Sequence, residues 1–174
     1  MSDFNINDIG SLEVAVSQAW EPIPAGTYTF EVDEAEWTES KAGNDMIVVT
    51  FICRDEGHEG ARFISRTVLT YVDKKTGVLK IHWDIPTLAH AAGGENLFPA
   101  DPVKRKAALK DGEAWMVKVA KGLVGKKAQL TLEVEAGRPY IDSNGEEREG
   151  NPQNVLKKMV FEAPAKTSAS SITL

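Results

Sequence analysis

The order of predicted strands and helices constrains the fold more than any other feature of this 174-residue chain. Three segments, residues 27–37, 46–54 and 61–72, alternate or run apolar as strands do. A stretch with helical spacing follows over residues 78–123, and two further strands are predicted at 128–135 and 154–162. This order predicts a mainly β fold with short helices. The specific prediction is a five-stranded OB-fold barrel with its helix between strands three and four.

The first predicted strand contains a change of phase. Tyr28, Phe30 and Val32 occupy alternate positions, whereas Ala35 and Trp37 continue on the opposite parity. One extra residue in a strand produces such a shift and bends the strand, so the sequence predicts a β-bulge here. A long, bent first strand is what an OB barrel requires.

The chain is predicted to form one domain with flexible additions. Residues 23–163 are the predicted OB-fold domain, and residues 104–127 within it are a basic helical insertion. Residues 1–22 are a predicted N-terminal arm, and residues 164–174 are a predicted flexible C-terminal tail rich in Ser, Thr and Ala.

Two further predictions concern packing and connectivity. Trp83 and Trp115 lie on the apolar sides of predicted helices and are expected in the core. Residues 137–153 are polar and are expected to form a long loop, with a tight turn at Asn144-Gly145.

Charge is unevenly distributed along the chain, whose formal net charge is −6. Residues 1–36 carry eight acidic side chains and no Lys or Arg, whereas residues 104–127 carry eight basic side chains against two acidic ones. Because phosphate binding depends on the local face, an acidic protein of this kind can still present a basic binding surface. A solvated helix surface is the equal alternative for any one of these lysines.

The sequence gives little support for catalysis. The basic run at residues 125–127 lacks the glycine spacing and the Ser/Thr of a phosphate-binding loop. His82 and His90 are eight positions apart, and His58 falls in a predicted turn. Cys53 is the single cysteine, which excludes an intrachain disulfide and a zinc knuckle. We therefore expect no enzymatic activity, no cofactor and no metal site.

Membrane association is not expected either. No apolar run approaches the ~20 residues that span a bilayer. The first residues lack the positive region and the apolar stretch of a signal peptide. The sequence predicts a cytoplasmic protein.

Basic and aromatic side chains on strands and loops favour binding to nucleic acid. Single strands are held by cations at the phosphates and by aromatic rings that stack on bases, at about 1–3 kcal/mol per stacked base.

Trp37 follows the phase slip and is a candidate for stacking, with a core position as the equal alternative. Arg62 and Arg66 share a strand parity and suit a phosphate track, unless they form salt bridges with glutamates of the first strand. Tyr140 can stack on a base or can anchor its loop to the barrel. The candidate nucleic-acid-binding residues are Trp37, Lys41, Arg62, Arg66, Lys126, Lys127, Arg138, Tyr140 and Lys158.

Four short motifs, taken in order, carry a resemblance to a known family. They are Ile23-Pro24-Ala25-Gly26-Thr27-Tyr28, Lys41-Ala42-Gly43-Asn44-Asp45, Gly125-Lys126-Lys127 and Asn154-Val155-Leu156. Over about residues 23–161 the chain resembles the bacteriophage and prophage family catalogued as domain of unknown function 669. The resemblance implies an OB-fold single-stranded DNA-binding protein of replication and recombination modules. It departs at the C-terminus, which lacks the acidic, partner-recruiting tail of many single-strand binders.

Together these observations predict a protein that binds single-stranded DNA without sequence preference and without a cofactor. It would protect exposed strands during phage replication or recombination, in the host cytoplasm if the chain is phage-encoded, with phage replication or recombination proteins as partners. A homo-oligomer is compatible with the sequence. The main alternative is a protein-binding β-barrel, an adaptor or virion component without a nucleic-acid role, which the acidic net charge favours. A nuclease with a carboxylate metal site is the second alternative.

Overall fold

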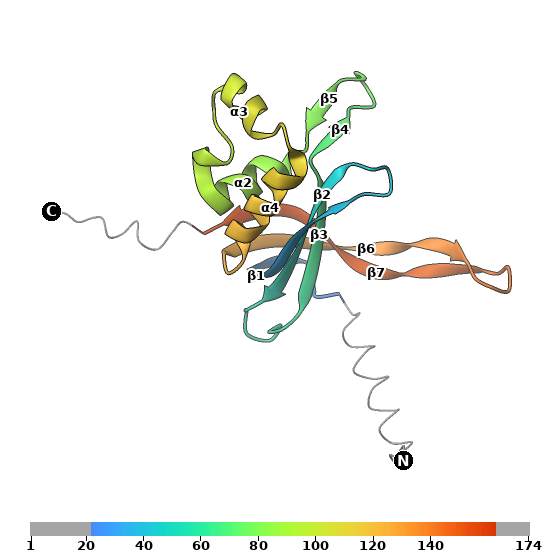
Figure 1. The fold of residues 1–174 in the computed structure, drawn as a ribbon. Coiled ribbons are helices and arrows are strands. Elements are labelled where there is room, and N and C mark those ends of the chain that lie inside the picture. The colour runs from blue at the N-terminus through green and yellow to red at the C-terminus, as the bar shows by residue number, and fades with distance from the viewer. Residues whose placement is uncertain (1–21, 163–174) are drawn as a thin grey trace, which may run out of the picture.

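The computed structural model describes residues 22–162, so the predicted arm, apart from Pro22, and the predicted tail lie outside the described residues. Five antiparallel strands form the main sheet in the order β3-β2-β1-β6-β7 (Figure 1). They are β1 (Gly26–Glu39), β2 (Asp45–Cys53), β3 (Arg62–Val68), β6 (Lys127–Ile141) and β7 (Glu147–Phe161). The prediction of a mainly β fold is confirmed.

Short elements connect β3 to β6. A two-stranded hairpin comes first, followed by three short α-helices and one turn of 3₁₀-helix. The hairpin strands are β4 (Thr70–Val72) and β5 (Leu79–Ile81), and the helices are α2 (Asp84–Gly93), η1 (Gly94–Asn96), α3 (Pro102–Ala108) and α4 (Gly112–Leu123). The helices therefore lie where the sequence places them, between the third and fourth strands of the main sheet.

Two of the helices begin at aspartate caps. The Asp101 carboxylate accepts a hydrogen bond from the Val103 amide at 3.1 Å, and Pro102 occupies the first turn of α3. The Asp111 carboxylate accepts one from the Ala114 amide at 3.1 Å and begins α4. Each cap satisfies a backbone donor that the helix leaves unpaired.

The bulge predicted in the first strand is confirmed. Val32 pairs with Phe51, but Glu34 pairs with Thr50, so the register of β1 against β2 shifts by one residue. Before the bulge, Gly26–Glu31 pair with β6, and only Phe30 and Glu31 among them also pair with β2, whereas after the bulge β1 pairs with β2 alone. The bend thus separates the β1–β2–β3 part of the sheet from β6 and β7.

The predicted closure into a barrel is wrong for the described residues, because β3 and β7 are the two edges of an open sheet. Aromatic side chains link these two edges through β2. The Phe51 ring of β2 lies 6.5 Å from the Phe63 ring of β3 and 6.4 Å from the Phe161 ring of β7, measured between centroids. The edges are thus joined by side-chain packing, and all eleven pairings that β7 makes in the sheet are with β6.

The core lies between the sheet and the helices α2 and α4. Phe30, Phe51, Leu88 and Met116 are at most 1% exposed. Trp115 is 3% exposed, and its indole N–H donates to the Leu97 carbonyl at 2.7 Å, which confirms its predicted core position.

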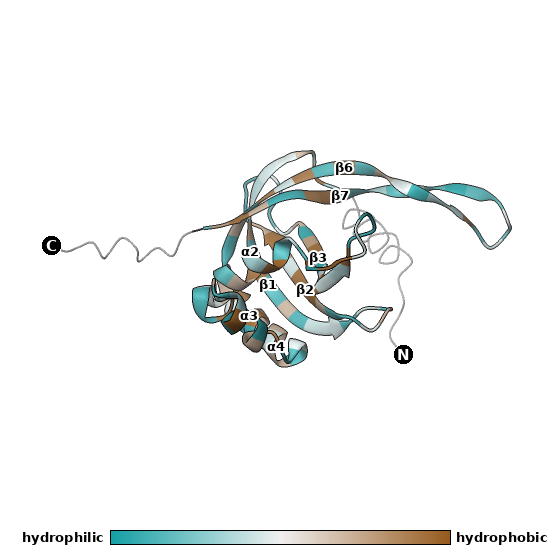
Figure 2. Cartoon of the chain, turned by 90° about the horizontal axis from the view of Figure 1, so that it is seen from above, coloured by the Kyte–Doolittle hydropathy of each residue, from teal (hydrophilic) through white to brown (hydrophobic). Residues whose placement is uncertain are grey.

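Residues 137–153 are not the predicted loop. β6 continues to Ile141 and β7 starts at Glu147, so the segment is the distal part of a long hairpin (Figure 1). The predicted Asn144-Gly145 turn does lie at its tip, where the Gly145 amide donates to the Asp142 carbonyl at 3.0 Å. Figure 2 shows that this part is largely hydrophilic. Because most side chains on both faces of the distal hairpin are exposed, the sequence lacks the apolar alternation by which strands are recognised.

Candidate nucleic-acid interface

On one face of the β1–β2–β3 part of the sheet, which we call the outer face, each strand carries side chains of a different chemical character. In register across the three strands, Glu36 lies opposite Val48, which lies opposite Arg66. Directly paired residues of antiparallel strands point to the same side of a sheet. The outer face is therefore acidic on β1, mainly apolar on β2 and basic on β3. Its members are Glu31, Glu34, Glu36, Thr38, Met46, Val48, Thr50, Ile52, Arg62, Ile64, Arg66 and Val68.

The two arginines of β3 are exposed and flank Ile64, which is 43% exposed. Within residues 22–162, neither Arg62 nor Arg66 takes part in an ion pair. β2 separates them from the glutamates of β1 by two strand spacings, about 9.6 Å. The alternative in which they form salt bridges with the first strand is therefore not found. Both guanidinium groups remain available to an external anion.

Trp37 lies on the opposite face of the same sheet. It pairs with Ile47, which is 1% exposed, and its indole N–H donates to the Asp45 carboxylate at 2.8 Å. A Cβ on Gly112, at the start of α4, would overlap that carboxylate, so the contact is closely packed. The ring is half-buried against the core and lies on the side away from Arg62 and Arg66.

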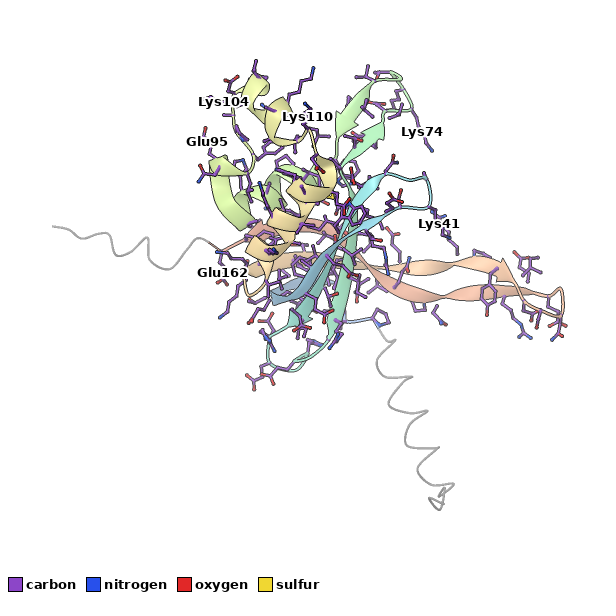
Figure 3. The ribbon with its side chains drawn as sticks, viewed as in Figure 1. Lys41, Lys74, Glu95, Lys104, Lys110 and Glu162 are labelled. Carbon is purple, nitrogen blue, oxygen red and sulfur yellow. The ribbon has the colours of Figure 1, made fainter. Side chains whose placement is uncertain are left out.

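Three hairpin ends project to one side of the molecule. In Figure 1 the β1–β2 turn, the β4–β5 hairpin and the tip of the β6–β7 hairpin lie to the right, with the helices on the left. Lys41 in the β1–β2 turn and Lys74 in the β4–β5 turn lie on this side, whereas Lys104 lies among the helices (Figure 3). Two of these hairpins, β1–β2 and β4–β5, thus carry a cation in their turns on the side away from the helices.

Arg138 and Tyr140 lie on the distal β6–β7 hairpin. Tyr140 is 54% exposed and pairs with Arg148, which forms ion pairs with Asp142 at 2.9 Å and Glu146 at 3.2 Å. The exposed ring does not anchor a loop to the sheet, because the segment is itself a strand pair.

Lys126, Lys127 and Lys158 lie on or beside β6 and β7 and not on β3. Lys127 begins β6 and pairs with Glu31 at the end of the sheet near α2. Lys158 is exposed on β7 opposite Thr131. Arg62 and Arg66 lie together on β3, and Lys127 is in register with Arg62 on the same face through Glu31 and Ile52, three strand spacings or about 14 Å away.

An exposed aromatic cluster, which was not predicted, lies where the chain leaves the end of β3. Trp83 is 68% exposed, so its predicted core position is wrong. Its ring centroid lies 3.9 Å from that of His82 with a 30° angle between planes, and 5.7 Å from that of Tyr71. The signal in the sequence is the polar turn Asp73–Gly77 between two apolar stretches, which is typical of a hairpin. A hairpin there brings the aromatic residues on either side of the turn together.

The break in the third predicted strand explains the position of this cluster. The strand was expected to run through residues 61–72, but it leaves the main sheet at Leu69. The Leu69 amide donates to the Asp45 carbonyl at 2.9 Å, and the Leu69 carbonyl accepts from the His82 amide at 3.0 Å. The chain then forms β4, which pairs with β5 and not with β2.

Burial shifts the pKa of His82, which belongs to the cluster, and of the neighbouring Asp84. Removal from water lowers the pKa of His82, whose Nδ1 accepts a hydrogen bond from the Asp84 amide at 3.1 Å. Removal from water also raises the pKa of the Asp84 carboxyl group. The imidazole is thus held neutral, in the tautomer that leaves Nδ1 free to accept.

Two negative findings apply to residues 22–162. No three His, Cys, Asp or Glu side chains among them are grouped as ligands for a metal ion. None of the helices in this part of the chain combines the length and apolar content required to cross a bilayer.

Comparisons with known proteins give one result. A protein-family model described as "Protein of unknown function (DUF669)" matches residues 11–147, which is more than three quarters of the chain. A search of the curated proteins finds no match.

Proposed function

We propose that this chain, which belongs to the DUF669 family of proteins of unknown function, binds single-stranded DNA without sequence preference. It would coat exposed strands in phage replication or recombination, without a cofactor and without catalysis. The DNA lies along β3 on the outer face.

The observation that carries the proposal is the pair of exposed arginines on β3, neither of which forms an ion pair among the described residues. Arginine presents a planar set of donors that suits phosphate. Between the two arginines Ile64 is 43% exposed, and it pairs with Thr50 of β2. Phosphates bound at Arg62 and Arg66 would thus be spaced along an apolar surface on which bases can lie.

The strand order supports a finer proposal about the fold, namely that it is a partly open OB barrel. In OB-folds the face of strands two and three and the loops between strands one and two and between strands four and five bind oligonucleotides. Here the corresponding parts are the outer face, the β1–β2 turn with Lys41, and the β6–β7 hairpin with Arg138 and Tyr140. The proposed site uses these parts, whereas Trp37 lies on the opposite face and Lys126, Lys127 and Lys158 belong to the β6–β7 side of the sheet.

A protein-binding role is the second candidate, and one specific surface favours it. Ile81, Val103 and Leu109 line an apolar groove between β5 and α3, and Val103 is 76% exposed. Exposed aliphatic side chains of this kind suit a protein partner better than a nucleic acid, because they offer neither charge nor a flat ring.

Fluorescence anisotropy of a labelled thirty-base oligo-dT, titrated with protein at several salt concentrations, tests the proposal. We expect binding that falls steeply with salt and that duplex DNA does not displace. The double variant Arg62→Ala/Arg66→Ala should reduce the salt slope by about 1.4, because each phosphate that a protein cation neutralises on a single strand contributes ~0.7 to that slope.

The matched control is Lys104→Ala/Lys106→Ala on α3, which removes the same charge among the helices (Figure 3). Equal losses of affinity in both double variants would show that net charge, and not the outer face, governs binding. Absence of binding by the unaltered protein at low salt would refute the proposed function and favour the protein-binding role.

A further inference from the structure

The cluster of Tyr71, His82 and Trp83 carries an inference about the same nucleic-acid-binding function, on which it rests. A tryptophan that is 68% exposed leaves much of its ring accessible, and an aromatic ring of this kind can stack on a base. We propose that Trp83 stacks on an unpaired base of the DNA strand that runs along β3. The proposed site thus has two parts, a phosphate track at Arg62 and Arg66 and a stacking platform at Trp83.

The platform is held in place before any ligand binds. The His82 imidazole lies 3.9 Å from the Trp83 indole between centroids, at 30°, and covers part of one side of it. Tyr71 meets both rings edge-on, at 6.1 Å from His82 and 5.7 Å from Trp83. A ring supported in this way loses little side-chain freedom when a base stacks on it.

The backbone fixes His82 from both directions. Its amide donates to the Leu69 carbonyl at 3.0 Å, and its own carbonyl accepts from the Ile85 amide at 3.0 Å. Its Nδ1 accepts from the Asp84 amide at 3.1 Å, which joins the ring to the start of α2. The imidazole beneath Trp83 is therefore positioned jointly by the end of the sheet and the first turn of a helix.

Cations lie on the same hairpin. Lys74 and Lys75 are exposed in the turn that joins β4 and β5, and Figure 3 labels Lys74 there. Neither takes part in an ion pair within the described part of the chain, whereas Lys80 pairs with Asp73 at 2.7 Å. An exposed ring at the base of a hairpin and lysines in its turn match a base and its phosphates, because stacking needs the ring face and the backbone needs the charge. A peptide partner of the same region would need a groove more than a flat ring.

The course of the chain joins the platform to the phosphate track. β3 leads through Leu69 directly into β4, so Tyr71 follows Arg66 by five residues and lies at most about 17 Å from it along the chain. A single strand bound at Arg62 and Arg66 can thus continue to Trp83 without crossing the acidic strand β1. This path requires bases free to unstack, which a duplex does not offer.

Two probes separate stacking from phosphate binding, namely a thirty-base oligo-dT and an abasic strand of the same length and charge. Trp83→Ala should weaken binding to oligo-dT by between about fivefold and 150-fold and leave binding to the abasic strand unchanged. Trp83→Phe keeps an aromatic ring and should retain most of the affinity for oligo-dT. Urea unfolding of each variant, with a midpoint equal to that of the unaltered protein, establishes that the fold is intact.

Each other outcome overturns the inference in a distinguishable way. If Trp83→Ala binds oligo-dT normally while Arg62→Ala/Arg66→Ala binds it weakly, the platform is refuted and the proposed function stands. If Trp83→Ala weakens binding to both probes equally, the indole acts by shaping the surface and not by stacking. If the unaltered protein binds neither probe at low salt, the proposed function and the stacking site fail together, and the exposed indole is left to a protein partner.

Discussion

Removing negative charge from β1 should tighten the binding of single-stranded DNA, because the glutamates of the outer face lie near the proposed phosphate track. Glu36 is in register with Val48 and Arg66, so two strand spacings, or about 10 Å, separate its backbone from that of Arg66. Glu34 occupies the same face one pair further along, opposite Thr50 and Ile64. Both glutamates are exposed and form no ion pair among the described residues.

The magnitude follows from Coulomb's law. Two unit charges ~10 Å apart in water repel by about 0.4 kcal/mol before screening by salt. Screening reduces this to about 0.3 kcal/mol at ~10 mM salt, where the Debye length is ~30 Å, and to about 0.15 kcal/mol at ~0.1 M, where it is ~10 Å. With one phosphate opposite each glutamate, Glu34→Gln/Glu36→Gln should tighten binding about 2.7-fold at the lower salt and about 1.7-fold at the higher.

Anisotropy titrations of labelled oligo-dT at these two salt concentrations measure the effect. The control is Glu95→Gln/Glu113→Gln, which makes the same change in net charge on η1 and α4. If the control tightens binding as much as the β1 variant does, net charge is the cause. If the β1 variant has no effect at ~10 mM salt, the DNA does not run along β3, since charges that are only weakly screened at this distance must interact.

Three other predictions concern stability. Phe51→Ala should lower the free energy of unfolding by about 3–5 kcal/mol in urea titrations, because this fully buried ring joins β2 to both sheet edges. The control Ile64→Ala on the outer face should change the free energy of unfolding by no more than about 0.5 kcal/mol. Burial lowers the pKa of His82 in the folded protein, so the unfolded chain binds a proton more readily at this residue. The free energy of unfolding should therefore fall as the pH drops below the ordinary histidine pKa of about 6.5. His82→Asn, which keeps an acceptor for the Asp84 amide, should make that fall shallower. A Cβ on Gly150 would overlap the Arg138 carbonyl oxygen, so Gly150→Ala should speed amide hydrogen exchange in the distal β6–β7 hairpin. The midpoint of global unfolding should stay within error. An unchanged exchange rate would contradict the close packing of this glycine.

Local chemistry made part of the fold predictable. The phase slip after Val32 is visible in the sequence because burial on one side of β1 imposes a strict alternation, and a single extra residue inverts it. Asp101 followed by Pro102 identified the start of α3, because a capping carboxylate and a residue without an amide proton both suit a helix N-terminus. These features depend on residues a few positions apart.

Features that depend on distant parts of the chain were not predictable in the same way. The distal β6–β7 hairpin lacks an apolar face, so its residues read as a loop although their backbones pair. Trp83 read as a core residue because its spacing to Leu88 and Ala92 suits one helix face, but α2 begins after it, at Asp84. Whether the sheet closes depends on β3 reaching β7, which no local pattern encodes.

The candidate site also contains one part that nearby residues determine and one part that distant residues determine, and Leu69 shows why. The pairing of Arg62 and Arg66 on one strand face could be inferred from their spacing alone, because strand parity is a local property. The aromatic cluster could not, because its position depends on hydrogen bonds from one buried residue to two distant ones. Leu69 donates to Asp45 at the base of the β1–β2 turn and accepts from His82 at the start of α2. The same residue thus ends the strand that carries the arginines and fixes the residue that supports Trp83, so the phosphate track and the stacking platform are set in one geometry by a single break in the sheet.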